Sequence, residues 1–182
     1  YAKLAREQGC EMFIAGCEMV MSEHREQEWR QVIAAIRKEY PGLVSYNTDK
    51  YQEDNVTWWD CVDVISSSGY YPIDDWDSQL DRIEAVVERF HKPFFFAECG
   101  CMSTVDSCYT PNDWSVTGAV DTAQQAAWYA EMFHKAGNRE FVQGFCLWDW
   151  PWKLYPVEKA AEDKGYSVYG KPAEEIVRTF YQ

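Results

Sequence analysis

The sequence predicts an α/β protein of the (β/α)8 TIM barrel class, and three observations support this prediction. Short apolar, β-rich runs alternate with segments of helical periodicity four times after an opening helix fragment, which is the pattern of βα units around a parallel sheet. The chain has no Gly-rich phosphate loop of the kind that open doubly wound sheets often carry. Its 182 residues are fewer than the ~200 that a complete barrel needs. We therefore expect residues 1–182 to form one domain, the C-terminal part of a barrel, with strands 4 to 8 and their helices present and the first three βα units absent.

The first half of the chain contains three of the five expected strands. We expect the end of a helix at residues 1–9, strands at 12–19, 43–46 and 62–66, helices at 23–40 and 75–90, and a helical turn at 56–59. The first of the two full helices ends before Pro41 and Gly42, and its apolar face is formed by Trp29, Val32, Ile33 and Ile36. The second is also amphipathic, with an inward face formed by Leu80, Ile83, Val86 and Val87.

The second half contains the other two strands and two long loops. Residues 93–99 form the most apolar strand, and its near-continuous FFFA run predicts burial on both faces. A polar loop at 100–120 leads to a helix at 121–135, where Asp121 and Gln124 give a capping-box-like start. A strand at 141–148, another long loop and a helix that begins at Pro172 complete the chain.

Charge and hydropathy narrow the classes of partner. With 30 acidic and 17 basic residues, the formal net charge of −13 would repel phosphate backbones, which argues against nucleic acid. No apolar stretch reaches the ~20 residues of a membrane-spanning helix, so we expect no membrane partner.

The cysteine pattern favours a reducing compartment. The chain has seven cysteines, an odd number, and Cys17, Cys61 and Cys146 lie in apolar runs where a free thiol packs as a small hydrophobic group. This favours a cytoplasmic over a secreted protein. Cys99 and Cys101 have no second Cys/His pair at zinc-site spacing, so we expect no bound metal.

Two glutamates stand at the ends of apolar strands, Glu18 after FIAGC and Glu98 after FFFA. In barrel enzymes the carboxyl ends of the strands form the floor of the active site, so side chains there face a ligand. Hydrolysis of a glycosidic bond requires one carboxylic acid to protonate the leaving oxygen and one carboxylate to attack or stabilise the anomeric carbon. The two glutamates meet that requirement, and their positions leave open which takes which role.

Several segments resemble those of the clan A glycoside hydrolases, most closely glycoside hydrolase family 113, the β-mannanases. These segments are AGCEM (15–19), SYN (45–47), WWDCVDVISSSGYYP (58–72), KPFFFAECGC (92–101) and GFCLWDW (144–150). The resemblance implies that Glu18 is the acid/base and Glu98 the nucleophile of a retaining double displacement. Their carboxyl groups are then expected to lie about 5–5.5 Å apart.

The chain departs from the clan pattern at one position. Many clan A enzymes place Asn directly before the acid/base to hold the sugar 2-hydroxyl, and this chain has Cys17 there. Asn47, expected just beyond the next strand, is the candidate replacement for that contact.

Nine tryptophans and many tyrosines serve either as core or as platforms that stack on sugar rings. The resemblance implies that Trp148 lies under the sugar at the cleavage point and that Tyr70 or Tyr71 contacts the nucleophile. We expect substrate stacking from Trp114, Trp150 and Trp152 in the long loops, a division of Trp58 and Trp59 between core and rim, and a core position for Trp128. We interpret His24, His91 and His134 as surface residues and Asp60 and Asp63 as structural caps.

The sequence thus predicts a retaining hydrolase of β-1,4-linked mannan or manno-oligosaccharides that needs no cofactor. The alternatives are a related enzyme acting on another β-linked glycan (glucan, xylan or galactan), a catalytically dead carbohydrate-binding barrel fragment, and a flavodoxin-like signalling domain. Missing strands would expose sheet edges and apolar surface. We therefore expect a complementary N-terminal segment of the same barrel as a partner.

Overall fold

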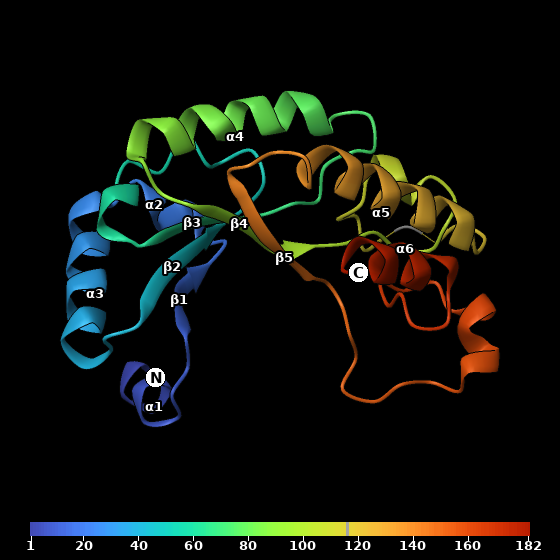
Figure 1. Ribbon diagram of the computed structural model, residues 1–182, viewed down its shortest axis with the longest axis horizontal. Coiled ribbons are helices and arrows are strands. Elements are labelled where there is room, and N and C mark those ends of the chain that lie inside the picture. Colours follow the sequence, from blue (N-terminus) through green and yellow to red (C-terminus); the bar gives the residue numbers. More distant parts are fainter. Residues whose placement is uncertain (116) are drawn as a thin grey trace. The chain divides into compact units, whose positions relative to one another are not determined.

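The computed structural model describes residues 1–115 and 117–182 and contains five parallel strands that alternate with helices (Figure 1). The strands are β1 (Met12–Cys17), β2 (Leu43–Thr48), β3 (Val64–Ser68), β4 (Phe94–Cys99) and β5 (Val142–Leu147). They lie in one sheet in chain order, β1-β2-β3-β4-β5. This order confirms the predicted succession of βα units.

Six α-helices and three short 3-10 turns connect the described strands or flank them. The helices are α1 (Ala2–Glu7), α2 (Val20–Glu23), α3 (Glu26–Glu39), α4 (Trp76–Phe90), α5 (Thr122–Ala136) and α6 (Pro172–Phe180). The turns are η1 (Trp59–Cys61), η2 (Ser107–Tyr109) and η3 (Val157–Glu162). Among the described residues, no helix has both the length and the apolar character needed to cross a membrane.

The chain divides into two compact units. The first contains residues 1–68, 81–97 and 141–144, and the second contains residues 69–80, 98–140 and 145–182. The single domain expected over residues 1–182 stays a prediction.

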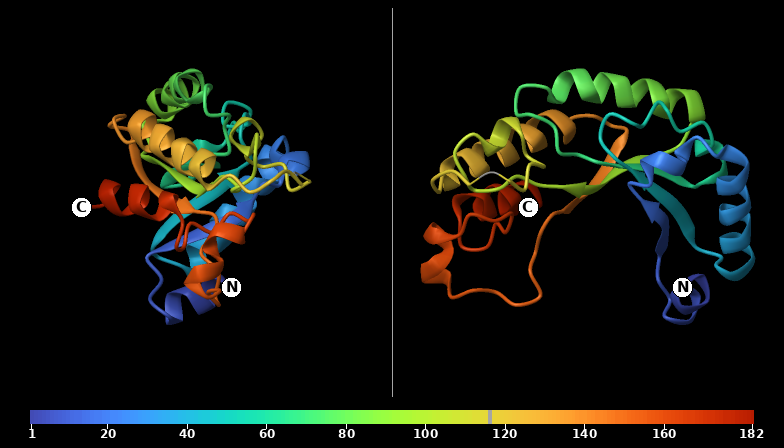
Figure 2. Two further views of the ribbon diagram at one scale, coloured as in Figure 1. Left: turned by 90° about the vertical axis from the view of Figure 1, so that its right-hand side faces the viewer. Right: turned by 180° about the vertical axis from the view of Figure 1, so that it is seen from behind.

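In the first unit, the helix expected at 23–40 is interrupted at its start. Residues 20–23 form α2, and α3 begins only at Glu26. At the end of α2 the buried Glu23 side chain accepts hydrogen bonds from Tyr46 and Thr48. Trp29 and Ile33 of α3 are buried, whereas Val32 is 42% exposed, so the expected inward face is narrower than predicted. Figure 2 shows α3 beside the β1–β2 edge of the sheet.

Strands β2 and β3 have the most complete burial of the five strands, although their sequences are not the most apolar. Four of their buried side chains are serines: Ser45, Ser66, Ser67 and Ser68. Ser45 and Ser66 hydrogen-bond to each other (2.9 Å) and to backbone carbonyl groups of the neighbouring strands. Ser45 and Ser66 are accommodated in this interior because their hydroxyl groups find hydrogen-bond partners locally.

The expectation that β4 is buried on both faces was wrong. Phe94 and Phe96 are buried, but the alternate residues Phe95 and Ala97 are partly exposed, so the strand shows the alternation of a sheet with one covered face. A continuous apolar run does not by itself distinguish these two environments.

The expectation that Cys17, Cys61 and Cys146 pack as small hydrophobic groups was also wrong in part. All seven cysteines are free, but Cys17 and Cys146 are exposed and Cys61 is half-buried; the buried thiols are those of Cys99, Cys101 and Cys108. Burial raises the pKa of the Cys101 thiol to about 12, so that thiol stays protonated at neutral pH.

The second unit is built around α5 and α6, which pack against each other (Figures 1 and 2). Asp121 caps α5 by accepting a hydrogen bond from the backbone N–H of Gln124, as predicted. Trp128 is fully buried, which confirms its core position. Phe133 of α5 stacks on Phe180 of α6 with 4.1 Å between ring centroids.

Candidate functional site

Glu18 follows β1 at a point where the β1–β2 ladder is irregular. Ile14 pairs with Ser45 and Cys17 with Asn47, so β1 uses one more residue than β2 over this stretch. Such bulges redirect side chains and are common beside active sites. Glu18 itself has φ of 50°, a left-handed conformation that non-glycine residues seldom adopt.

Two hydrogen bonds hold the backbone on either side of the Glu18 side chain. The Glu18 N–H donates to the carbonyl of Asn47 (2.8 Å), and the Met19 N–H donates to the Tyr46 hydroxyl (3.0 Å). Tyr46 in turn donates to the buried carboxylate of Glu23 (2.8 Å). Burial, followed by the hydrogen bond to Glu23, raises the pKa of Tyr46, so its hydroxyl stays a donor. These bonds hold Glu18 in its strained conformation.

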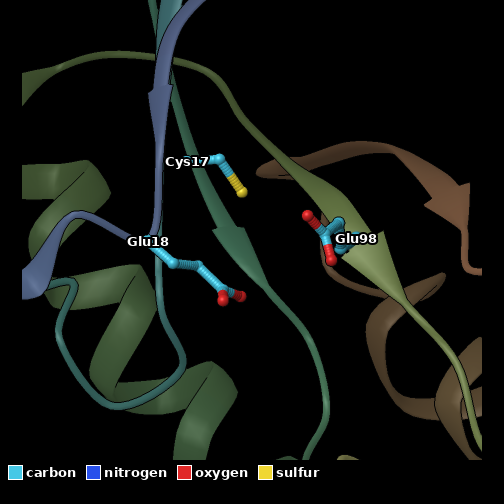
Figure 3. Close-up of side chains that lie close together, drawn as sticks. All are labelled: Cys17, Glu18 and Glu98. Atoms are coloured by element: carbon cyan, nitrogen blue, oxygen red, sulfur yellow. The ribbon is translucent and has the colours of Figure 1, made fainter.

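The Glu18 side chain receives its own hydrogen bond. The Ser68 hydroxyl, at the end of β3, donates to Oε1 of Glu18 (2.5 Å). The amide of Asn47 donates to Ser68 Oγ (3.1 Å) and to Cys17 Sγ (3.3 Å). Figure 3 shows Cys17 and Glu18 next to each other at the end of β1.

Asn47 lies within β2 rather than beyond it, because this strand is two residues longer than predicted. Its side chain is 1% exposed and both of its amide donor bonds go to protein atoms. The 2-hydroxyl contact expected from Asn47 stays a prediction.

In the second unit, Glu98 stands one residue before the end of β4 (Figure 3). The Tyr70 hydroxyl donates a hydrogen bond to Glu98 Oε2 (3.0 Å). Burial, and then the negative charge of Glu98, raise the pKa of Tyr70, so the phenol stays protonated and remains a donor. Of the two tyrosines expected near the nucleophile, Tyr70 makes the contact. Tyr71 is fully buried, with its ring edge-on to Trp76, so we assign it to the core.

Trp148 follows β5 and is held close to the end of β4. Its backbone N–H donates to the carbonyl of Cys99 (2.7 Å). A Cβ atom on Gly100 would lie 2.0 Å from the Trp148 carbonyl oxygen, so only glycine permits this approach. The Trp148 ring is 37% exposed and can therefore present a face to a ligand.

Trp148 also lines a cavity of about 360 Å³ in the second unit. Aromatic rings and several charged side chains surround it: Met102, Trp114, Trp148, Asp149, Pro151, Lys153, Tyr155, Asp163, Gly165, Tyr166 and Ser167. Apolar rings with a few polar groups are what a carbohydrate-binding pocket presents. Behind its wall, buried Lys171 pairs with Asp163 (2.6 Å) and donates to Gly165 O (3.1 Å), which fixes one side of the cavity.

The other tryptophans differ in position: one lines the cavity, some lie at the surface and some are in the core. Trp114 lines the cavity edge-on to Trp148, whereas Trp150 and Trp152 are absent from the described lining, and Trp152 is 97% exposed. Trp58 and Trp59 do not divide between core and rim as expected. Both are fully buried, and their indole N–H groups are satisfied by the carbonyls of Glu23 and Glu53.

The three histidines keep their interpretation as surface residues, whereas the two aspartates are structural ion-pair partners and not helix caps. The histidines at positions 24, 91 and 134 are exposed. Asp60 pairs with Arg30, and Asp63 pairs with Arg37 and accepts from the Val44 N–H (2.7 Å). These aspartates tie α3 to neighbouring segments and take no part in the sites described above.

Two residues that contribute to these sites were not predicted from the sequence. Ser68 holds Glu18, and Tyr166 lies edge-on to Tyr70 and lines the cavity. The serine run at the end of β3 was a usable signal, since buried hydroxyl groups in a strand usually have hydrogen-bond partners. Tyr166 lies in a long loop where no local pattern marks it.

Comparison with known proteins places these features in a family. A sequence profile of Glycoside Hydrolase Family 113 matches residues 1–171. The chain is similar along its whole length to a solved complex of a family 113 β-1,4-mannanase, with 56% identity and a TM-score of 0.98, and covers 59% of that protein. It is also similar to the family 113 β-mannanase AaManA from Alicyclobacillus acidocaldarius, solved with ManMIm, with 47% identity, a TM-score of 0.96, and coverage of 100% of this chain and 58% of that one.

A more distant likeness supports the fold alone. A β-glucuronidase from Ruminococcus gnavus matches with 15% identity and a TM-score of 0.61, over 86% of this chain and 29% of that protein. No protein with a curated description matches the chain. The chain thus spans less than two thirds of the family 113 structures that it matches, and its five-stranded sheet is a partial barrel.

Proposed function

The chain belongs to glycoside hydrolase family 113, and we propose that it contributes the catalytic carboxylates of a retaining β-1,4-mannanase. The observation that carries the proposal is that two carboxylates at the carboxyl ends of parallel strands each accept a hydrogen bond from a neighbouring side chain. Ser68 holds Glu18 after β1, and Tyr70 holds Glu98 in β4. The carboxyl ends of barrel strands are where such enzymes carry out their chemistry.

In the proposed double displacement, Glu98 attacks the anomeric carbon while Glu18 protonates the departing glycosidic oxygen. This step gives a glycosyl ester on Glu98. Glu18, now a carboxylate, then takes a proton from a water molecule, which attacks the anomeric carbon and releases Glu98 with overall retention. Tyr70 supports the second step in particular, because its hydroxyl can stabilise the carboxylate that leaves.

The proposed substrate is mannan or manno-oligosaccharide, because similar solved structures are described as a β-1,4-mannanase and a β-mannanase. Trp148 and Trp114 are proposed to stack on sugar rings in the cavity, with no cofactor. The greater length of these relatives supports the further proposal that a complementary segment of the same barrel packs beside this chain.

The decisive experiment measures hydrolysis of β-1,4-mannan, glucan and xylan in parallel by the full-length protein, with NMR detection of the anomer first released. Preferential cleavage of mannan with initial release of the β-anomer is expected. Preference for glucan or xylan would overturn the substrate assignment and leave the mechanism standing. Initial release of the α-anomer would overturn the retaining mechanism. Carbohydrate binding without hydrolysis would identify a binding module.

A further inference from the structure

We propose that Ser68 is a positioning residue for Glu18 and determines which oxygen of its carboxyl group carries the proton. This inference rests on the proposed role of Glu18 as the acid/base. It arises from three side chains on successive strands of the first unit: Glu18 after β1, Asn47 in β2 and Ser68 at the end of β3.

The direction of the hydrogen bonds in this group follows from what each side chain can donate. The Asn47 amide nitrogen has two hydrogen atoms, and it donates to Cys17 Sγ and to Ser68 Oγ. A serine hydroxyl has a single hydrogen atom. Because Asn47 already donates to the Ser68 oxygen, the Ser68 hydrogen is directed to Glu18 Oε1 (2.5 Å).

The environment keeps this arrangement fixed. Asn47 is 1% exposed and Ser68 is fully buried, so bulk water does not compete for their hydrogen bonds. The neighbouring hydrogen bond from the Glu18 N–H to the Asn47 carbonyl (2.8 Å) ties the Glu18 backbone to the same residue. Asn47 therefore anchors Glu18 twice, directly through the backbone and indirectly through Ser68.

The consequence for catalysis concerns the two carboxyl oxygens. A proton on Oε1 would convert that oxygen into a hydroxyl oxygen, which is a weaker acceptor, and would weaken the hydrogen bond from Ser68. Protonation on Oε2 keeps the bond from Ser68 to Oε1 intact. Oε2 is thus the oxygen that gives its proton to the leaving group and later accepts one from water, while Oε1 stays bound to Ser68 throughout the cycle.

The bond also biases the balance between the two states of Glu18. Hydrogen bonds to an ionised carboxylate favour the ionised form. The first step needs Glu18 protonated, so kcat/KM falls at high pH as Glu18 loses its proton. Without the Ser68 hydroxyl, Glu18 should keep its proton to higher pH.

The test is the pH profile of kcat/KM for an aryl β-mannoside with the full-length Ser68→Ala protein. The alkaline limb should move upward by about one pH unit, which corresponds to the loss of one charge-assisted hydrogen bond. The acidic limb should stay in place. A general loss of structure would lower the whole profile and would not move one limb alone.

Three variants make the result interpretable. Ser67→Ala is the matched control, since Ser67 is a buried neighbour whose hydroxyl has no hydrogen-bond partner among the described residues. Its profile should coincide with that of the wild type. Ser68→Cys fills nearly the same space with a weaker donor, so its alkaline limb should move upward by less than that of Ser68→Ala. This variant provides the test if Ser68→Ala folds poorly. Glu18→Gln should abolish the alkaline limb.

The outcomes separate the two proposals. If Glu18→Gln retains the alkaline limb, Glu18 is not the acid and the proposed function fails at that residue. If Glu18→Gln abolishes the limb but Ser68→Ala and Ser68→Cys leave it at the wild-type pH, the role of Ser68 is overturned and that of Glu18 stands. An upward shift in both Ser68 variants, absent in Ser67→Ala, supports the inference.

Discussion

The hydroxyl group of Tyr70 donates a hydrogen bond of 3.0 Å to Oε2 of Glu98. Because Glu98 is the proposed leaving group of the second step, this bond should stabilise the carboxylate as it departs. A hydrogen bond to a charged group contributes ~1.5–3 kcal/mol, so Tyr70→Phe should slow release of the glycosyl-enzyme by roughly 10- to 150-fold. Rapid-mixing kinetics with a dinitrophenyl β-mannoside should show a burst of phenolate followed by a slow steady state.

The matched control for this variant is Tyr109→Phe, which removes a hydroxyl from a tyrosine that is 53% exposed. It should leave both phases unchanged. A Tyr70→Phe protein with wild-type steady-state rate and no larger burst would show that the Tyr70 bond does not act on the reaction.

The two carboxylates should respond differently to loss of their charge. Glu98→Gln removes the nucleophile, so hydrolysis of every β-mannoside should fall by several orders of magnitude, on the order of 10⁴-fold or more. Glu18→Gln removes the proton donor, which matters least when the leaving group is already stable as an anion. With dinitrophenyl substrates its first step should persist, and added azide should restore turnover by replacing the activated water. Normal turnover by Glu98→Gln would exclude Glu98 as the nucleophile.

The candidate positions of Glu18 and Glu98 were accessible from the sequence because each glutamate directly follows a recognisable apolar run, whereas their proposed roles came from the family resemblance. The order of βα units and the cap at Asp121 were predictable for the same reason, since they depend on local periodicity and short-range hydrogen bonds. Ser68 was not, because its partner is 50 positions away in the chain and the bond exists only once β1 and β3 lie in the same sheet. Trp58 and Trp59 were misjudged because the carbonyl groups that accept their indole N–H bonds, those of Glu23 and Glu53, become neighbours of these rings only in the folded chain.

The lining of the cavity in the second unit predicts which tryptophans contribute to substrate affinity. Trp114 lines the cavity beside Trp148, whereas Trp152 is 97% exposed and not part of the described lining. Trp114 is 69% exposed without a ligand, so a sugar ring stacked on it would cover it, and truncation of an aromatic anchor that is buried in a complex removes ~2 kcal/mol or more. Trp114→Ala should therefore raise KM for manno-oligosaccharides by roughly 30-fold with a smaller effect on kcat.

Trp152→Ala is the matched control for Trp114→Ala, because it makes the same chemical change at a residue outside the cavity lining. Its KM should stay within about twofold of the wild type, an energy difference below ~0.5 kcal/mol. Equal effects of the two substitutions, measured with the same oligosaccharide series, would show that the cavity is not where sugars bind.

The last prediction concerns Glu23, whose carboxylate is 3% exposed and accepts hydrogen bonds from Tyr46 (2.8 Å) and Thr48 (2.6 Å). Burial is the largest influence and raises the pKa of Glu23 above its ordinary value of 4.5. The folded protein therefore binds this proton more tightly than the unfolded chain does. Stability from this residue is fully present below the unfolded pKa and is lost as pH rises through the folded pKa.

Glu23→Gln keeps an oxygen that can accept both hydrogen bonds but has no proton to lose. The difference in melting temperature between Glu23→Gln and the wild type should therefore grow in favour of the variant as pH rises from about 4.5 toward neutrality. Calorimetry at a series of pH values measures this difference. The comparison variant is Glu175→Gln, at a side chain that is 73% exposed, for which a much smaller pH dependence is expected. A difference for Glu23→Gln that stays constant with pH would show that the proton affinity of Glu23 is the same in the folded and unfolded states.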